Sequence, residues 1–435
     1  MRRARRFSAP LWLALVASAQ AVAGERAAES PSLEALVAQT LPDVRAWRRD
    51  LHAHPELSNR EVRTSKLVAK ALRAEGYEVR TGVAHTGVIG VLRGAGPVVA
   101  LRADMDALPV TEETGLPFAS HERATYEGHE VGVMHACGHD AHTAMLLGVA
   151  KVLAARRFDL GGTVVLLFQP AEEGAPRGER GGAKLMLEEG AFDAPRPDAV
   201  FGLHVTAELP VGHVGIRSGA ATASSDRLTI RVKGRQSHAA SPWQGVDPIA
   251  TASRIVLEIE SLPAREVDVR IPSVVSIGSF QGGVRNNIIP DEVELQGTIR
   301  SLDPQQRAAL HEKVRRSAQG IAQASGAEAE VAIEEGNPMV WNDPALLARM
   351  RPALERAAGA AEVEEMRPWT AAEDFAFYAQ QVPGLFFWLG VRRPDVAVAD
   401  AAQIHTPRFD LDEAALPLGV RAMSELALAF LHGSP

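Results

Sequence analysis

Residues 134–142, which read MHACGHDAH, concentrate more potential chemistry than any other stretch of this sequence. They hold three histidines, an aspartate and the only cysteine of the chain, Cys137. A single cysteine cannot form a disulfide within the chain, and thiolate and neutral imidazole groups are ligands that suit zinc-like divalent ions. The alternative is a buried cysteine that acts as a small hydrophobic residue beside histidines that cap a helix. We favour the metal site.

The N-terminus has the composition of an export signal. Residues 1–23 contain four arginines and no acidic residue, with an apolar run from Ala9 to about Val16 and then small residues that suit cleavage. This run is too short to cross a bilayer, so we predict a cleaved signal peptide and a secreted or periplasmic protein. Loss of the four positive charges would take the formal net charge from −8 to −12. We therefore expect neither nucleic acid nor an anionic membrane as a partner.

The length and the cysteine count add two constraints. A chain of 435 residues is longer than one hydrophobic core usually serves, so we expect two domains. Exported proteins commonly carry disulfides, whereas Cys137 has no partner within the chain. Its thiol would be open to oxidation unless something occupies it, and metal ligation would do so.

The spacing of apolar residues predicts alternating helices and buried strands. Apolar residues recur at helical spacing from Leu33 to Leu51, where Pro42 is expected to divide the helix in two. Further helices are predicted over 61–75 and 141–155. Short continuous apolar runs, typical of strands buried on both faces of a mostly parallel sheet, occur at 88–92, 98–101, 164–168, 199–203 and 385–389.

Polar residues follow three of these runs directly. Asp104 and Asp106 follow the second run, Glu172 and Glu173 follow the third, and His204 follows the fourth. Open α/β sheets gather ligand sites beyond the carboxyl ends of their strands, so these residues are expected to converge. Taken singly, each has an ordinary structural explanation, because a carboxylate often caps the next helix and a lone histidine is usually structural. The hypothesis depends on the group as a whole.

Residues 214–333 have a different pattern. Strands at 227–233, 273–280, 292–300 and 327–333 and helices at 248–262 and 304–324 give the order βαββαβ, a ferredoxin-like unit. Because buried-strand character resumes near Leu385, this α+β unit is predicted to be an insertion. His238 lies in its first loop, where spacing alone would suggest only a solvated histidine.

A series of motifs spans nearly the whole chain and resembles the M20 metallopeptidase clan, in the amidohydrolase branch that holds aminoacylases, hippurate hydrolases and auxin-conjugate hydrolases. The motifs, in order, are 52–58, 101–109, 137–139, 169–174, 202–205, 287–291, 297–300, 372–375 and 405–409. The resemblance implies a zinc-exopeptidase-like α/β catalytic domain with an inserted lid or dimerisation domain. The expected divisions are a signal peptide at 1–23, catalytic parts at 30–213 and 334–435, and the lid at 214–333.

The resemblance also implies a metal centre. It would hold two divalent ions (Zn, Mn, Ni or Co), and Cys137 would bridge them where other branches use an aspartate. The implied metal ligands are Cys137, His139, Glu173, His204 and His405. Glu172 corresponds to the catalytic base, while Asp104 and Asp106 would support the ligands from behind.

The inserted domain is implied to complete the active site. His238 would donate a hydrogen bond to the developing oxyanion, often from the partner subunit, which implies a homodimer. Asn287 and Arg300 are candidates to bind the substrate or its carboxylate. The chain departs from the family pattern at Trp243, which replaces a histidine, and at Ala372, where glycine or serine is common. These departures affect the expected substrate choice more than the chemistry.

We therefore expect a metal-dependent amidohydrolase that splits a small N-acyl amino acid, or a short peptide, into a carboxylic acid and an amino acid. The nearest alternative is a dipeptidase or carboxypeptidase of the same clan. An alternative of another class is a catalytically silent protein that binds acylated amino acids or metal.

Overall fold

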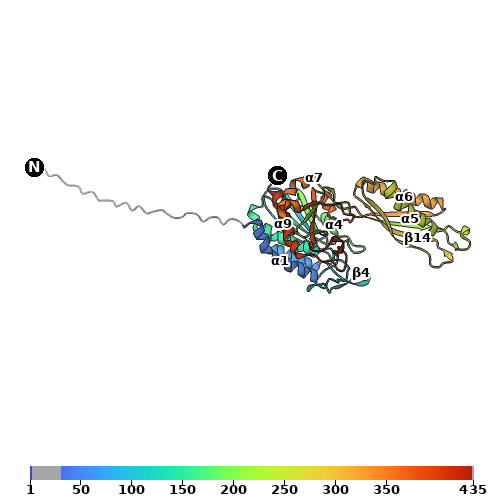
Figure 1. The fold of residues 1–435 in the computed structure, drawn as a ribbon, viewed down its shortest axis with the longest axis horizontal. Helices are drawn as coiled ribbons and strands as arrows, with labels where there is room; N and C mark the ends of the chain where they lie inside the picture. The colour runs from blue at the N-terminus through green and yellow to red at the C-terminus, as the bar shows by residue number, and fades with distance from the viewer. Residues whose placement is uncertain (2–30, 434–435) are drawn as a thin grey trace.

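A computed structural model describes Met1 and residues 31–433, which form a large domain and a smaller one beside it (Figure 1). The signal peptide predicted at 1–23 lies outside the described residues apart from Met1, so it stays a prediction. In Figure 1 the smaller domain carries α5, α6 and β14, and the remaining labelled elements belong to the large domain.

The large domain is built on an eight-stranded sheet in the order β1-β2-β6-β3-β7-β18-β8-β17. Its four central strands, β6, β3, β7 and β18, are parallel, and antiparallel pairs occur toward the edges. This is the mostly parallel sheet that the apolar runs predicted. The strands are β1 (Glu78–Val83), β2 (Gly87–Leu92), β3 (Val98–Asp104), β6 (Thr163–Gln169), β7 (Ala199–Pro210), β8 (Val214–Ile216), β17 (Val363–Glu365) and β18 (Gly384–Arg392).

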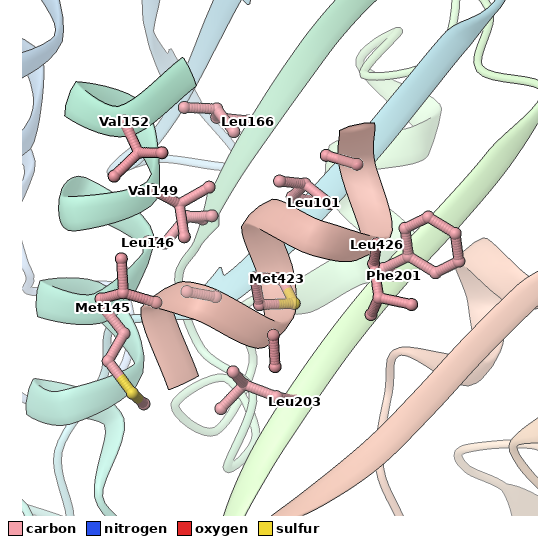
Figure 2. Packing of buried hydrophobic residues seen from close by; sticks show 14 of the residues in the cluster. Leu101, Met145, Leu146, Val149, Val152, Leu166, Phe201, Leu203, Met423 and Leu426 are labelled. Carbon is pink, nitrogen blue, oxygen red and sulfur yellow. The ribbon is translucent and has the colours of Figure 1, made fainter. Parts of the chain in front are cut away.

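The central strands are apolar on both faces because each face is covered by helices. In β3, Leu101 packs into one core and its neighbour Ala100 packs into the other. One face is covered by α1 (Leu33–Ala53), α2 (Val62–Ala74), α3 (His139–Ala155), α7 (Pro344–Ala358) and α9 (Leu416–Leu431), and the other by α4 (Gly182–Glu188) and α8 (Ala376–Ala379). Figure 2 shows side chains of α3 and α9 packed against leucines and Phe201 of the strands. Burial on both faces explains why the strands lack a polar alternation.

The expected break at Pro42 is wrong, because α1 runs without interruption from Leu33 to Ala53. Val37, Val44 and Leu51 on one side of this helix are buried, and the helix packs on α3 and α9. Tertiary packing of this apolar face outweighs the backbone hydrogen bond that a proline removes.

One helical stretch, Glu413–Leu431, is long and apolar enough to cross a membrane, but 78% of its 18-residue window is buried inside the protein. It includes α9, which lies against α1, α3, α7 and the strands β3 and β7. Its hydrophobicity is accounted for by this core position.

The smaller domain contains a four-stranded antiparallel sheet in the order β12-β14-β10-β15, with two helices packed on one face. Its elements follow the predicted order βαββαβ: β10 (Asp226–Lys233), α5 (Pro248–Arg265), β12 (Ser273–Gln281), β14 (Glu292–Ser301), α6 (Pro304–Ala324) and β15 (Glu328–Glu335). In β10 buried and more exposed residues alternate, as expected for a sheet covered on one side only. That this domain acts as a lid or dimerisation domain stays a prediction.

The domain boundary predicted at residue 214 is too early. Val214–Ile216 forms β8, which pairs with β18 and β17 in the large sheet. The chain leaves and re-enters the large domain side by side, at the paired strands β9 (Gly219–Ala220) and β16 (Trp341–Asn342). Two further two-stranded pairs are β4 (Arg123–Tyr126) with β5 (His129–Gly132), and β11 (Ser237–His238) with β13 (Ile288–Ile289).

Candidate metal centre

Segments far apart in the sequence meet just beyond the carboxyl ends of the central strands. Cys137 and His139 lie where the chain enters α3, and Glu173 lies in the loop after β6. His204 lies within β7, and His405 lies in the loop between β18 and α9. The structure thus brings together all five predicted ligands, as the open-sheet principle requires.

The five ligand residues form two groups that share the cysteine. In the first, Cys137 Sγ is 3.3 Å from His204 Nε2, and potential ligand atoms of these two residues and His139 all lie within 4.8 Å of one another. In the second, Cys137 Sγ is 3.2 Å from His405 Nε2, which is 3.1 Å from Glu173 Oε1. A sulfur common to two groups of three ligands suits a pair of cations with a bridging thiolate.

Two positions in the left-handed backbone region shape this cluster. Gly138 has φ +90°, and a Cβ atom there would lie 2.4 Å from Val205 Cγ2, so only glycine fits between Cys137 and His139. His405 has φ +64°, and its N–H donates to the carbonyl of Ala136 at 2.7 Å. This hydrogen bond ties the loop of His405 to the segment that carries Cys137.

The hydrogen bonds of two histidines direct their outer nitrogens into the cluster. His139 Nδ1 donates to the carbonyl of Asp106 at 2.8 Å, and His204 Nδ1 donates to the carbonyl of Val205 at 2.7 Å. A carbonyl can only accept, so each Nδ1 carries a hydrogen, and each Nε2 can bind a cation once it holds no proton. Among the described residues, the buried atom His139 Nε2 has no hydrogen-bond partner, and it lies 3.9 Å from Glu173 Oε1. A buried nitrogen without a partner beside a carboxylate oxygen fits a bound metal ion.

The ionisation of the cluster also favours a positive charge at its centre. Burial and the nearby Glu173 raise the pKa of the Cys137 thiol well above its usual value. Burial lowers the pKa of His139, but the carboxylates of Asp104 and Asp106 outweigh it and raise that pKa to about 10. Burial and the charge of His142 lower the pKa of His204 well below its usual value, which favours the neutral imidazole.

The third histidine of the motif, His142, is already engaged on both sides. Its Nδ1 is 2.6 Å from Asp104 Oδ1, and its Nε2 accepts the N–H of Val205 at 3.0 Å. His142 therefore lies behind the ligands and holds the strand that carries His204.

Asp106 organises the loop of the two glutamates. Its Oδ1 accepts the N–H of Glu172 at 3.1 Å, and its Oδ2 accepts the N–H of Glu173 at 3.0 Å. The same carboxylate accepts the hydroxyl of Ser58 at 2.7 Å. Asp104 lies beside it and bonds His142 and Arg102. Asp104 Oδ2 also lies 3.7 Å from His139 Nε2, and the supporting role of both aspartates stays a prediction.

A buried arginine that the sequence analysis did not single out joins the strands beneath the site. Arg102 donates to Asp104 Oδ2 at 2.7 Å, to Glu373 Oε1 at 2.9 Å and to Asp374 Oδ1 at 3.0 Å. Its Nε donates to Gln169 at 2.9 Å. Arg102 and its acidic partners lie in motifs quoted for the resemblance, 101–109 and 372–375, but spacing gives no sign that they meet.

Glu172 lies between the ligand cluster and this buried acidic group. Its carboxylate belongs to one set of mutually close atoms with His139 and Glu173, and to another with Glu373 and Asp374. Burial, followed by the charges of Glu373 and Glu173, raises the pKa of Glu172 well above its usual value. A carboxylate that holds a proton readily, beside a candidate metal pair, can exchange protons with a bound reactant.

A second missed residue, Glu61, supports the loop from below. Its wholly buried carboxylate accepts the N–H of Ala171 at 2.9 Å, the N–H of Asn59 at 3.0 Å and the hydroxyl of Thr86 at 2.5 Å. Ala171 has φ +53°, so the backbone turns sharply immediately before Glu172. Burial, followed by the charge of Asp106, raises the pKa of Glu61 to about 8.

The candidates on the smaller domain form no hydrogen bond to this centre among the described residues. His238 is exposed, and its Nδ1 accepts the N–H of Ala240 at 3.0 Å. Asn287 lies beside it, because its carbonyl accepts the N–H of Ala239 at 3.1 Å. Arg300 is half-buried on β14, and burial lowers its pKa. The structure thus brings His238 and Asn287 together, and the roles of all three stay predictions.

A thiol, imidazole and carboxylate cluster at the carboxyl edge of a parallel sheet, with a further glutamate beside it, fits a metal-dependent hydrolase. Residues 100–429 match the model of peptidase family M20/M25/M40. The chain belongs to this family and is an amide hydrolase of that group.

Similarity to individual proteins extends over most of the chain. It is 41% identical over 388 residues to the N-acetylcysteine deacetylase of Bacillus subtilis (88% of this chain, 96% of that protein). It is 41% identical over 387 residues to thermostable carboxypeptidase 1 of Saccharolobus solfataricus (88% and 94%). A crystal structure of the Bacillus subtilis YXEP protein, described as a dinuclear metal-binding peptidase of the M20 family, matches with a TM-score of 0.75 and 38% identity (91% and 99%).

Proposed function

We propose that this protein hydrolyses the amide bond of N-acyl amino acids and releases a carboxylic acid and an amino acid. The observation that carries the proposal is the pair of ligand groups joined through Cys137, with Glu172 beside them. The similarity to a protein named as an N-acetylcysteine deacetylase supports this substrate class.

Five residues would hold two divalent cations. His139 and His204 would bind one, Glu173 and His405 would bind the other, and Cys137 would bridge the pair. Zinc, manganese, nickel and cobalt are the candidates, and the thiolate and imidazole donors favour zinc. When bound, such ions lower the pKa of water and polarise a carbonyl.

Glu172 would act as the general base and then as the general acid. Its carboxylate would accept a proton from the attacking water and deliver it to the nitrogen of the leaving amine. Asp106 and Glu61 would hold Glu172 in place through the backbone N–H groups of residues 171–173. The acidic pair Glu373 and Asp374 disfavours a negative charge on Glu172, which suits a group that must hold a proton between two steps.

The smaller domain would complete the site in a homodimer. His238 would donate a hydrogen bond to the oxyanion, and Asn287 and Arg300 would bind the substrate carboxylate. Because His238 makes no hydrogen bond to the ligand cluster within residues 31–433, it would reach the site by domain closure or from a partner subunit. Several apolar side chains of this domain are exposed and support an interface, among them Trp243 (76%), Phe280 (42%) and Val284 (94%). Sedimentation of the wild type and of Trp243→Ser tests the dimer.

We also propose that the protein is exported after removal of residues 1–23. Fractionation of the producing cells, with N-terminal sequencing of the mature protein, tests this part. A mature chain that begins at Met1 in the cytoplasm would contradict it.

A panel of N-acyl amino acids, assayed with added Zn²⁺, Mn²⁺, Co²⁺ or Ni²⁺, tests the activity. We expect turnover with wild type, and a fall in kcat of about 10²-fold or more in Glu172→Gln, since general acid–base groups contribute about 10²–10⁴-fold. Glu34→Gln, an exposed glutamate in the first turn of α1, is the matched control and should keep wild-type turnover. Wild-type turnover in Glu172→Gln would rule out its role as the base.

A carboxypeptidase or dipeptidase is the second candidate, because the chain is equally similar to a protein named as a carboxypeptidase. Competition between free dipeptides and N-acyl amino acids separates the two. A higher kcat/KM for dipeptides would favour the peptidase. A silent binding protein would instead retain an N-acyl amino acid unchanged through long incubation with metal.

A further inference from the structure

A cavity of about 340 Å³ opens beside the candidate metal centre, on the side of Glu173. Apolar residues from two segments line much of it: Leu57, Ala107, Leu108 and Pro109. The tip of the β4–β5 hairpin, including Tyr126, lines it as well. The volume lies at the lower end of the range for small-molecule sites.

The backbone of the residues that form the apolar floor is held by pairing with neighbouring segments. Leu57 and Ala107 form an isolated parallel bridge. Leu108 pairs with Met134, three residues before Cys137, through reciprocal N–H to carbonyl bonds of 3.0 Å. The floor is therefore fixed directly to the segment that carries the bridging cysteine.

The hairpin supplies an aromatic wall. Tyr126 is 39% exposed, and the turn after it has φ +48° at Glu127 and +83° at Gly128. Positive φ at two successive residues is typical of the tight turn that joins two antiparallel strands. This short hairpin holds an aromatic ring at the edge of the cavity, where an apolar ligand would cover it.

We propose that this cavity binds the acyl group of the substrate, and that the protein prefers aliphatic or aromatic acyl groups larger than acetyl. This inference rests on the proposed function. An amino-acid carboxylate would need a cation, and the floor residues supply none. The two arginines of the lining are Arg60, which is engaged by Glu179, and Arg177, which is exposed. An acyl chain would lie on the apolar residues, whereas a carboxylate would lie toward Arg177.

The expected preference follows from burial of the chain. Each buried methylene contributes about 0.8 kcal/mol, which corresponds to about fourfold in kcat/KM. From acetyl to hexanoyl, four methylenes would raise kcat/KM about 10²-fold. The rise should stop when the cavity is full.

The test compares kcat/KM for acetyl, butanoyl, hexanoyl, octanoyl and benzoyl derivatives of one amino acid. We expect Leu108→Trp, which fills the floor, to lower the ratio of kcat/KM for the hexanoyl substrate to kcat/KM for the acetyl substrate at least tenfold. Tyr126→Ala should lower kcat/KM for the hexanoyl substrate several-fold, because the aromatic wall is lost. Phe158→Ala, an exposed aromatic (96%) outside the cavity, is the matched control and should leave the profile unchanged. Thermal unfolding of each variant checks the fold.

Each outcome decides a different point. The acyl cavity would be overturned if kcat/KM of the wild type did not change with acyl length, or if it followed the amino-acid side chain instead. Either result would leave the proposed function standing. Equal losses for acetyl and hexanoyl in both variants would also overturn it. If no acylated amino acid is hydrolysed with any of the four metals, the proposed function fails and the acyl cavity fails with it.

Discussion

Replacement of Asp106 by alanine should weaken metal binding and slow catalysis, although we assign Asp106 no bond to either cation. Its wholly buried carboxylate accepts the N–H groups of Glu172 (3.1 Å) and Glu173 (3.0 Å) and the hydroxyl of Ser58 (2.7 Å). In Asp106→Ala these two N–H groups lose their acceptor within the protein, and the loop after β6 loses its anchor.

The magnitude follows from these contacts. A buried donor left without a partner costs about 1–3 kcal/mol, and removal of a group that supports a metal ligand typically costs about 10–100-fold in metal affinity. We expect Asp106→Ala to raise the Kd for the more weakly held ion by about 10–100-fold. At saturating metal, kcat should still fall at least tenfold, because Glu172 is displaced. Asp106→Asn keeps one acceptor oxygen and should be intermediate.

Titration of the metal-free protein against a competing chelator measures the first effect, and kcat at saturating metal measures the second. Asp198→Ala is the matched control. Asp198 likewise accepts a backbone N–H, that of Val98 at 2.8 Å, but at the opposite end of β3. The Asp198→Ala variant should keep wild-type metal affinity and kcat. Wild-type values in Asp106→Ala would refute the assignment of Asp106 as the group that positions the two glutamates.

Three further predictions concern other buried groups. Glu61→Leu removes the acceptor of the Ala171 N–H and should lower kcat at least tenfold with little change in KM. Glu61→Gln retains an acceptor and should recover most of kcat. Equal losses of kcat in the two variants would contradict the positioning role. The pKa of His52 is lowered by burial but raised overall, to about 9, by Asp140, so the protonated form is favoured in the folded state. Its contribution, on the order of 3 kcal/mol, is complete below the unfolded pKa of about 6.5 and is lost as pH rises through about 9, so denaturant midpoints should fall over this window in wild type and less in His52→Gln. Leu426→Ala on α9 should lower the free energy of unfolding by about 2–5 kcal/mol in chemical denaturation, since its side chain is wholly buried against the sheet; a loss below 1 kcal/mol would contradict the core assignment (Figure 2).

The strands of the large sheet could be predicted from sequence because burial on both faces leaves continuous apolar runs. The run at 164–168 became β6 and the run at 385–389 became β18, each within two residues at either end except where β18 extends to Arg392. The length of the helix from Leu33 to Ala53 was harder to predict. The effect of a proline is judged from its sequence neighbours, whereas the packing of α1 on α3 and α9 depends on residues far along the chain. Strand β8 was assigned to the wrong domain, because three residues carry too little pattern to show which sheet they join.

The site could be predicted only partly from local pattern. Cys137 and its neighbouring histidines predict a metal site. Their spacing does not indicate that His405, 268 residues away, lies next to the sulfur. That placement came from the family resemblance. The support of the glutamate loop by Glu61, and the buried position of Arg102, could not be read from sequence. A single charged residue in a helix-like or strand-like stretch looks the same whether it faces solvent or a buried partner.

Metal analysis of the purified protein and of Cys137→Ala tests the central claim most directly, which is that one sulfur joins two cations. Both proteins would be loaded with Zn²⁺, freed of excess ion and analysed for metal per chain and for turnover of an N-acyl amino acid. We expect two ions per chain and turnover in wild type, and at most one ion with loss of turnover in Cys137→Ala. Two ions and undiminished turnover without the thiol, or a wild-type protein that binds none, would contradict the account.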